Sequence, residues 1–364
     1  MSDSESLKNM LTPVSVNLLF DGMVIQEDVY DATATRLIAK SGITLNAGNI
    51  ERIRSLNAGN DTIYVSGDMF KMLIERMPPA EVVKREELEE TTGYAAIKDE
   101  TLGMLDDITS NQAVETETVH SVSNELSNRL EECSPSEILS LINSLAPMDE
   151  YLQRHCVNVS LLNGLIGRWL GMTKEDVDEL IVIGLAHDCG KALIPLQVLD
   201  APRKLTVAEF EVMKMHPVHS YELLVNFAEP IRRAARCHHE KVNGLGYPDR
   251  VSFDNLSVQS RITAVSDIYD AMISQRAYKP PKSPFSILAM LVSLSGMELD
   301  TRLVNLFIQK MPVELIGKQI EMSDGSVGVV RSFDLNDIEY PMIEINGRVI
   351  KTNKQLYCLC MHSE

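Results

Sequence analysis

The sequence predicts a mainly α-helical protein, in which one large helical domain is flanked by a small mixed α/β domain and a small antiparallel β domain. Three observations lead to this prediction. Apolar residues recur three and four positions apart from about residue 92 to 311, as in amphipathic helices. Short apolar runs separated by turn residues precede this stretch, and after Pro312 the apolar period becomes two. We therefore expect domain limits of 1–80, 92–311 and 313–360.

The first domain is expected to contain short strands and one helix. Apolar and polar residues alternate from 14 to 18, and apolar runs at 37–39 and 63–65 predict two further strands. Asn46 is placed to cap a short amphipathic helix that closes near Gly59. Because no catalytic cluster occurs here, we expect a regulatory role for this domain.

The two domain boundaries are marked by proline. Pro78 and Pro79, followed by an acidic run at 86–90, predict a linker before the helical domain. In the last domain, Asp324-Gly325 and Asn346-Gly347 each interrupt alternating apolar residues. An Asp-Gly or Asn-Gly pair in that setting predicts a β-hairpin.

Composition excludes several classes of function. The net charge of −18 makes long nucleic acid an unsuitable partner, because such binding relies on many Lys and Arg contacts to phosphate. A small anion is still possible where a metal and a few local cations hold it. The chain has no apolar run long enough to span a membrane, and its polar, acidic start does not resemble a secretory signal. Six cysteines without a C-x-x-C pair predict reduced thiols in a cytoplasmic protein.

The residues that could carry chemistry lie in the helical domain. Six of the eight histidines fall between positions 155 and 239. His187 and Asp188 are adjacent, near an expected helix end, and are followed by Gly190, expected to end the helix, and Lys191. A carboxylate has two oxygens, so Asp188 could bridge two cations. A His-Asp pair alone is a weak signal, and a surface pair would be the ordinary interpretation.

Further candidate ligands surround this pair in the sequence. His238 and His239 can both reach one metal if they lie at a helix end that faces it. His155 and His216 are single histidines that would more often be ordinary core or surface residues. Asp267 lies in an apolar helical run, where a buried carboxylate must be paired or bound to metal. Five imidazoles and two carboxylates are too many ligands for one metal, and they suit two borderline ions, with iron or manganese preferred to zinc.

The order of these motifs resembles that of the HD-GYP family of metal-dependent phosphodiesterases. The family pattern places a histidine, then His-Asp-x-Gly-Lys, a histidine, a His-His pair and an aspartate in this order, as here. Gly246-Tyr247-Pro248 follows the paired histidines and matches the element that names the family. The resemblance covers roughly residues 92–311. It implies a helical HD-type metallohydrolase domain that hydrolyses cyclic di-GMP to pGpG or GMP.

The resemblance also implies roles for individual residues. One metal would be held by His155, His187, Asp188 and Asp267, and the other by Asp188, His216, His238 and His239. Lys191 would contact the phosphate being cut and act with Asp188 in catalysis. Other substrate contacts are expected from Tyr247, Asp270, Arg276 and Lys279, although Asp270 could instead orient a ligand, and Tyr247 could simply pack in its loop.

Two positions depart from the family pattern. Asn243 stands where the family usually has aspartate, which keeps hydrogen bonding but removes a charge. Tyr151 stands where some members have a glutamate that binds a third metal, and Glu150 is offset by one residue, a rotation of about 100° on a helix. We therefore expect two metals. Cys156, Cys189 and Cys237 adjoin proposed ligands, and we expect small buried apolar residues there rather than a redox shell.

Three functions remain open at this point. The first is a cyclic di-GMP phosphodiesterase that lowers this second messenger, with signalling proteins as partners of the flanking domains. The second is a catalytically weak sensor that binds the dinucleotide. The third is a phosphohydrolase of the wider HD superfamily that acts on another nucleotide phosphate. The intact ligand set and Lys191 favour the enzyme. The sequence leaves the oligomeric state open.

Overall fold

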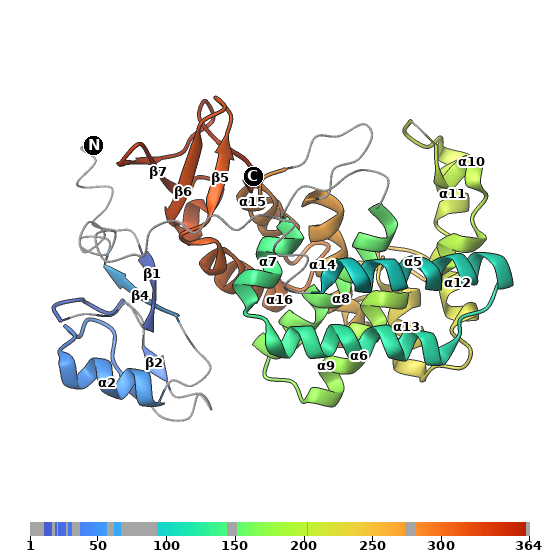
Figure 1. Ribbon diagram of the computed structural model, residues 1–364, viewed down its shortest axis with the longest axis horizontal. Coiled ribbons are helices and arrows are strands. Elements are labelled where there is room, and N and C mark those ends of the chain that lie inside the picture. Colours follow the sequence, from blue (N-terminus) through green and yellow to red (C-terminus); the bar gives the residue numbers. More distant parts are fainter. Residues whose placement is uncertain are drawn as a thin grey trace. The chain divides into compact units, whose positions relative to one another are not determined.

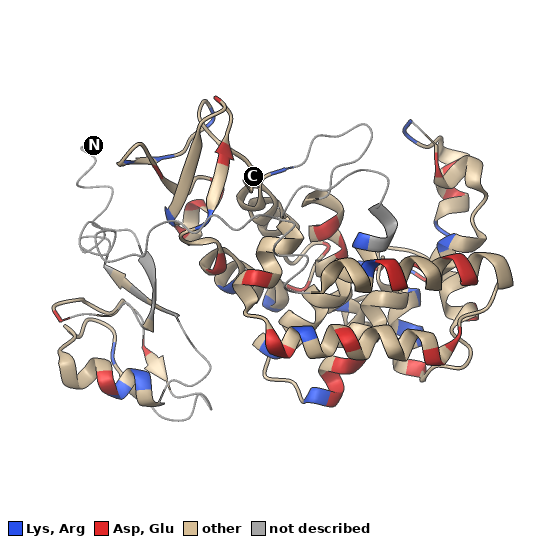
Figure 2. Cartoon of the chain, in the orientation of Figure 1, with Lys and Arg blue, Asp and Glu red and all other residues tan. Residues whose placement is uncertain are grey.

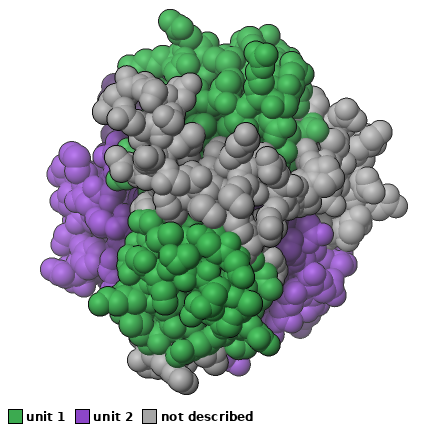
Figure 3. All heavy atoms as spheres, turned by 90° about the vertical axis from the view of Figure 1, so that its left-hand side faces the viewer, with its two compact units in different colours: residues 1–82, 315–358 green, residues 83–314, 359–364 purple. Residues whose placement is uncertain are grey.

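A computed structural model of the chain describes residues 11–16, 19, 21–26, 28–30, 37–56, 62–66, 93–143, 151–201, 203–273 and 282–361 (Figure 1). The chain divides into two compact units, which Figure 3 colours separately. The first comprises residues 1–82 and 315–358, and the second residues 83–314 and 359–364. The described elements are mostly helices, with small antiparallel sheets, so the predicted fold class is confirmed.

The N-terminal part of the first unit has two antiparallel strand pairs and one helix. Strand β1 pairs with β4, and β2 pairs with β3. Asn46 caps the helix, since its Oδ1 accepts a hydrogen bond from the backbone N–H of Asn49 at 2.9 Å. Buried apolar residues such as Met23, Ile25 and Ile53 form its core. The elements are β1 (Leu11–Ser15), β2 (Val29–Tyr30), β3 (Leu37–Ala39), α2 (Ala47–Leu56) and β4 (Thr62–Ser66).

The C-terminal strands form one five-stranded sheet in the order β8-β7-β6-β5-β9. Both predicted hairpins are confirmed, because β5 pairs with β6 around Gly325, and β7 pairs with β8 around Asn346 and Gly347. These three turn residues have φ values of 81°, 49° and 76°, the left-handed region that Asn and Gly tolerate. The elements are β5 (Gln319–Met322), β6 (Val327–Ser332), η7 (Leu335–Asp337), β7 (Met342–Ile345), β8 (Arg348–Lys351) and β9 (Cys358–Met361).

The second unit is helical in its described residues between 93 and 314, as expected, and its last described residues belong to strand β9. Its elements are α5 (Tyr94–Asn111), α6 (Thr116–Glu132), α7 (Pro135–Asn143), α8 (Tyr151–Trp169), α9 (Lys174–Ala186), η4 (Cys189–Leu193), α10 (Leu196–Leu199), α11 (Val207–Met213), α12 (His216–Leu223), α13 (Glu229–Cys237), η5 (Phe253–Asn255), α14 (Val258–Ile273), α15 (Pro284–Leu294), α16 (Thr301–Lys310) and η6 (Met311–Leu315).

Helix α8 is the centre of this unit and packs against α5, α9 and α14 (Figure 1). The chain is almost fully buried from Arg154 to Gly167. Helices α8 and α9 approach closely because Gly184 has no side chain: a Cβ there would lie 2.5 Å from the Cα of Ser160. This packing turns the middle of α8 and the end of α9 toward the same interior region.

The surface of this unit carries both signs of charge. Figure 2 shows Lys and Arg as well as Asp and Glu on its helices. Some form ion pairs along a helix, for example Arg129 with Glu125 at 2.6 Å and with Glu132 at 2.8 Å. None of the helices in the described ranges has both the length and the apolar character needed to cross a bilayer.

Candidate metal centre

Five helices and the turns that follow them bring the predicted ligands together. His155 lies in the second turn of α8, and Asp267 lies in α14. His187 and Asp188 follow the last residue of α9, as predicted. His216 begins α12, and His238 and His239 follow the last residue of α13. Helix ends are suited to such a site, because side chains there can converge without distorting a helix.

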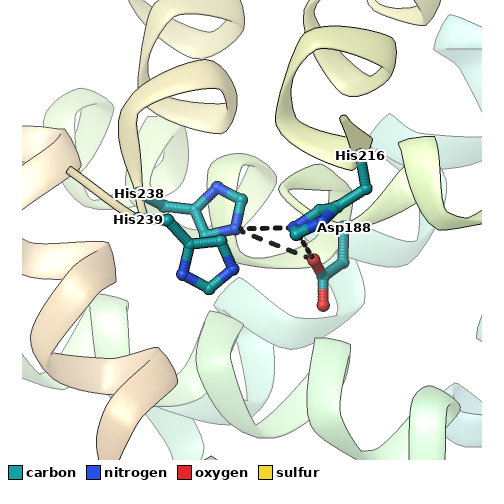
Figure 4. Close-up of side chains that lie close together, drawn as sticks. All are labelled: Asp188, His216, His238 and His239. Atoms are coloured by element: carbon teal, nitrogen blue, oxygen red, sulfur yellow. Dashed lines mark hydrogen bonds and ion pairs between the residues drawn. The ribbon is translucent and has the colours of Figure 1, made fainter. Parts of the chain in front are cut away.

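Among the described residues, two groups could each hold a metal ion. One consists of Asp188, His216, His238 and His239, whose side chains point toward one another in Figure 4. The other consists of His155, His187 and Asp267. Within each group, one ligand atom from each residue lies within 4.8 Å of the others. All seven predicted ligands are therefore in these two groups. Asp188, which the resemblance assigns to both ions, is grouped with His216, His238 and His239.

The Asp188 carboxylate lies between the two groups. Its Oδ2 is 3.3 Å from the Nε2 of His155 and 3.3 Å from the Nε2 of His187. Its Oδ1 is 3.2 Å from the Nε2 of His216 and 3.7 Å from the Nε2 of His238. Each carboxylate oxygen thus faces a different group, as a bridging ligand requires.

The tautomer of four of the histidines follows from the partner of Nδ1. In His187, His216 and His238, Nδ1 lies 2.7 Å from the carbonyl oxygen of the residue three positions earlier. In His155, Nδ1 lies 2.7 Å from Oδ2 of Asp270. Carbonyl and carboxylate oxygens only accept, so each Nδ1 must carry the proton. Each Nε2 then presents a lone pair to the centre, which is the form in which histidine binds metal.

Some of the atoms that could bind a metal lack hydrogen-bond partners within the described part of the chain. The Nε2 of His187 and the Oδ1 of Asp188 are buried and make no hydrogen bond there. The Nε2 atoms of His216 and His238 lie 3.3 Å apart with both Nδ1 protons already assigned. Two nitrogen lone pairs at that distance repel each other unless a cation lies between them. The residues therefore fit divalent metals, and imidazole with carboxylate suits iron, manganese or zinc.

Burial and neighbouring charges set the protonation of three of the proposed ligands, Asp188, His238 and His239. Burial lowers the pKa of His238 well below its ordinary value and lowers that of His239 to about 3. Burial acts to raise the pKa of Asp188, but Lys191 and His187 outweigh it and hold that pKa well below the usual range. At neutral pH His238 and His239 are therefore neutral imidazoles, and Asp188 is an ionised carboxylate.

Gly190 has a different role from the one predicted. Helix α9 already ends at Ala186, and Gly190 lies in η4 without a positive φ, so it does not end the helix. A Cβ at Gly190 would lie 2.1 Å from the carbonyl oxygen of His216 and 2.4 Å from the backbone nitrogen of Ser220. The glycine is needed because η4 and α12 touch backbone to backbone, which places His216 beside Asp188.

The loop after the paired histidines is attached to the site by Glu240. Its Oε1 accepts hydrogen bonds from the backbone N–H groups of Asp249 at 2.6 Å and Arg250 at 2.8 Å. Gly244 has a φ of 74°, in the left-handed region that favours glycine, whereas Gly246 is required because of a close backbone contact. A Cβ at Gly246 would lie 2.4 Å from the Cα of Glu240.

Tyr247 lies over His239, one of the proposed ligands. Its ring centroid is 4.8 Å from that of His239, at an interplanar angle of 31°. The Phe210 ring is 6.3 Å away and nearly perpendicular, and the Lys214 ammonium is 5.9 Å from the Tyr247 centroid. Phe210 is 44% exposed, so an aromatic and cationic surface borders the centre. The sequence did not single out Phe210, which lies on α11, or Lys214, which follows its last residue, because both are distant from Tyr247 along the chain.

The remaining predicted residues have different outcomes. The Lys191 ammonium forms an ion pair with Oδ2 of Asp188 and is partly exposed. Asp270 is fully buried and hydrogen-bonds His155 and Asn158, which favours the alternative expectation, the orientation of a ligand. Arg276 and Lys279 lie outside the described residues, as does the side chain of Tyr151.

The other two sequence expectations concern Asn243 and the cysteines. Asn243 keeps a side-chain hydrogen bond, because its Oδ1 accepts from the backbone N–H of Leu245 at 2.9 Å. Cys156, Cys189 and Cys237 are buried, and burial raises the pKa of their thiols to about 12, 12 and 11. Such thiols are protonated and unreactive at neutral pH, which agrees with small apolar core residues.

The family model described as HD domain matches residues 120–303, about half of the chain. A cyclic di-GMP phosphodiesterase of Pseudomonas aeruginosa is 29% identical over 262 residues, which cover 70% of this chain and 63% of that protein. The cyclic di-GMP phosphodiesterase response regulator RpfG of Xanthomonas campestris is 32% identical and is 55% covered, with 56% of this chain matched. The 3'3'-cGAMP-specific phosphodiesterase 2 of Vibrio cholerae is 29% identical over 50% of this chain and 35% of its own length. The chain thus matches less than two thirds of the length of these relatives.

A solved structure, the HDG"Y"P protein Bd1817 from Bdellovibrio bacteriovorus, has the same fold over 81% of this chain and 97% of its own chain. The TM-score is 0.50 and the sequence identity 13%. From the matched family model, the relatives and the ordered His and Asp motifs, the chain belongs to the HD domain family, in its HD-GYP branch.

Proposed function

We propose that the chain is a two-metal phosphodiesterase that hydrolyses cyclic di-GMP to pGpG or GMP. The observation that carries this proposal is the position of Asp188, with one oxygen toward each of two ligand groups. A carboxylate shared between two metals is typical of centres that catalyse displacement at phosphorus.

The ligand assignment follows from the two groups. His155, His187 and Asp267 with one oxygen of Asp188 would hold the first ion, and His216, His238 and His239 with the other oxygen would hold the second. When bound, two such ions lower the pKa of a water and bind the oxygens of the phosphate. We propose iron or manganese rather than zinc, and the imidazole and carboxylate donors accommodate either ion.

Lys191 is proposed to bind the phosphate that is cut. Its ammonium already lies at Asp188 Oδ2, so it is within reach of any phosphate oxygen at the same centre. Its side chain is 18% exposed, which keeps it accessible to substrate. The positive charge of Lys191 offsets the net negative charge of the protein locally, where the phosphate would bind.

The choice of substrate rests on the names of the relatives and on the surface beside the centre. The relatives named above act on cyclic di-GMP or 3'3'-cGAMP, both cyclic dinucleotides of purines. Phe210 and Tyr247 offer ring faces or edges to a base, and Lys214 offers a positive charge. Arg276 and Lys279 are proposed to hold the second phosphate.

The test is a chromatographic assay of the full chain, purified without oxygen and loaded with Fe²⁺ or Mn²⁺. Cyclic di-GMP, 3'3'-cGAMP and bis(p-nitrophenyl) phosphate are compared, and metal content is measured in parallel. We expect two ions per chain and hydrolysis of cyclic di-GMP. Lys191→Ala should lower kcat/KM by about ten- to a hundredfold on each substrate, since a charge-assisted hydrogen bond is lost. Asp188→Asn should lose activity and metal together.

Lys174→Ala is the matched control, because this lysine is exposed and pairs with Glu131 on the surface. It should behave as the unaltered protein. If two ions bind and cyclic di-GMP binds but is not cut, the sensor alternative is correct. Hydrolysis of other nucleotide phosphates in preference to cyclic dinucleotides would point to the wider HD phosphohydrolase class.

A further inference from the structure

A chain of buried hydrogen bonds leads from α5 to the first group of ligands. The Tyr94 hydroxyl lies 2.7 Å from Oδ1 of Asn158, and Nδ2 of Asn158 lies 2.7 Å from Oδ1 of Asp270. The other oxygen of Asp270 lies 2.7 Å from Nδ1 of His155. These four residues are 0–2% exposed, so water does not compete for these hydrogen bonds.

The direction of each hydrogen bond in this chain is determined. The Asp270 carboxylate can only accept, so the Asn158 amide nitrogen must face it. The Asn158 oxygen then faces Tyr94, and the tyrosine hydroxyl must donate. At the other end, Asp270 accepts from Nδ1 of His155, which leaves the Nε2 lone pair for the metal. One orientation of Asn158 therefore agrees with one tautomer of His155.

The orientation of His155 depends on this series of hydrogen bonds, whereas the orientation of His187, His216 and His238 does not. His187, His216 and His238 are oriented by carbonyl oxygens of their own helical turns, which the backbone holds in place. His155 is oriented by a side chain on another helix, and that side chain is held in turn by Asn158 and, through it, Tyr94. Loss of the Asn158 amide removes one of the hydrogen bonds that fix the orientation of the Asp270 carboxylate, and with it the orientation of the His155 imidazole.

We propose that Tyr94 and Asn158 are positioning residues for the metal bound by His155, His187 and Asp267. The inference rests on the proposed metal centre, and it adds that one ion depends on α5 while the other does not. Tyr94 is the first residue of α5, so the hydrogen bonds tie the beginning of this helix to the centre.

The test measures metal affinity rather than activity. Co²⁺ is titrated into the metal-free full chain and followed by its visible absorption. Tyr94→Phe removes only the hydroxyl. Asn158→Ala removes the amide side chain that links Tyr94 to Asp270. Loss of a residue that orients a metal ligand typically costs about 10–100-fold in affinity. We expect about a tenfold loss for Tyr94→Phe, confined to one of the two ions, and a larger loss for Asn158→Ala.

Two double variants, each combining Tyr94→Phe with the loss of one proposed ligand, identify the affected ion. In a His216→Ala chain, which leaves the first group complete, Tyr94→Phe should weaken the remaining ion. In a His187→Ala chain, which leaves the second group complete, it should leave the remaining ion unchanged. If the chain of hydrogen bonds transmits the effect, Tyr94→Phe should cause no further loss once Asn158 is alanine.

Tyr269→Phe is the matched control. Tyr269 is equally buried in the same unit, and its hydroxyl also donates to an asparagine, Oδ1 of Asn143, at 2.5 Å. It should lose thermal stability like Tyr94→Phe and keep both affinities. Equal losses of both ions, no loss at all, or the same loss in Tyr269→Phe would overturn the inference, as would an unaltered chain that binds fewer than two ions. Two ions without hydrolysis would contradict only the proposed function.

Discussion

At the scale of single residues, the centre depends on how each ligand is held as much as on the ligands themselves. Four imidazoles commit Nδ1 to an acceptor and present Nε2 to the centre. Three of the acceptors are backbone carbonyls, which any residue could supply, so no side-chain motif reveals them. Only the fourth, Asp270, could be suspected from the sequence, as a carboxylate one helical turn after Asp267.

Gly190 offers a test of the contact that places His216. In Gly190→Ala, the new methyl group would overlap the backbone of His216 and Ser220, which cannot rotate away. We expect a loss of about 1–3 kcal/mol or more in the free energy of unfolding, the usual cost of overpacking. Because His216 must move, the ion of the second group should be lost preferentially. Urea unfolding and metal analysis measure the two effects.

Gly103→Ala serves as the control for this substitution. Gly103 lies on an exposed face of α5, and no atom lies within 4 Å of a Cβ built there. This variant should be more stable by about 0.5–1 kcal/mol, because alanine is the better helix former. Metal content should not change. A Gly190→Ala protein with normal stability and two ions would mean that η4 can move away from α12 without disturbing the centre.

At the scale of elements, the ends of helices and one loop hold most of the residues of the proposed site. The loop after α13 is held by the hydrogen bonds of Glu240 and by a bidentate ion pair between Arg236 and Asp249. In this pair, Nε and Nη2 of Arg236 lie 2.6 and 2.7 Å from the two carboxylate oxygens of Asp249. This attachment keeps Tyr247 over His239. The sequence identified the loop through its Gly-Tyr-Pro element. It did not identify Glu240 as the residue that holds it, because the partners of Glu240 are backbone N–H groups nine and ten positions away.

Removing the Glu240 carboxylate should release this loop. In Glu240→Ala two hydrogen bonds to a charged acceptor are lost, each worth about 1.5–3 kcal/mol. If Tyr247 contributes to binding, KM for cyclic di-GMP should rise about tenfold or more. Bis(p-nitrophenyl) phosphate has no purine to contact, so its kcat/KM should change little. Steady-state kinetics on both substrates decide the matter.

Glu240→Gln is the paired variant, since it keeps an acceptor oxygen of the same reach. It should retain most of the affinity for the dinucleotide. Equal losses on both substrates in Glu240→Ala would show that the loop supports the metals, through His239, rather than the substrate.

At the scale of the whole molecule, the fold class and the grouping of the ligands could both be anticipated. Helical periodicity and the Asn-Gly and Asp-Gly turns are local signals, and the structure has the corresponding helices and hairpins. The contacts of Gly190 and Gly246, and the link from Tyr94 to Asp270, join residues that are distant in sequence. Such contacts result from tertiary packing, and no local pattern in a single sequence reveals which distant residues will meet.

The domain limits remain a prediction, and a truncated chain of residues 83–314 tests them. All seven proposed ligands, Lys191, Asp270, Asn158 and Tyr94 lie within this range, and each described hydrogen bond of the ligands ends within it. It also keeps α5, whose buried side chains Ile97, Met104 and Ile108 belong to this unit. We therefore expect the shortened chain to fold, to bind two ions and to hydrolyse bis(p-nitrophenyl) phosphate at a rate comparable to that of the full chain.

A chain of residues 112–314, which lacks α5, should lose stability and the ion held by His155, because the hydroxyl of Tyr94 and the packing of α5 are both removed. Circular dichroism, metal analysis and the ester assay separate these cases. If residues 83–314 fold and hold two ions but hydrolyse nothing, residues outside this range contribute to catalysis, and the division of the chain proposed from its sequence is wrong.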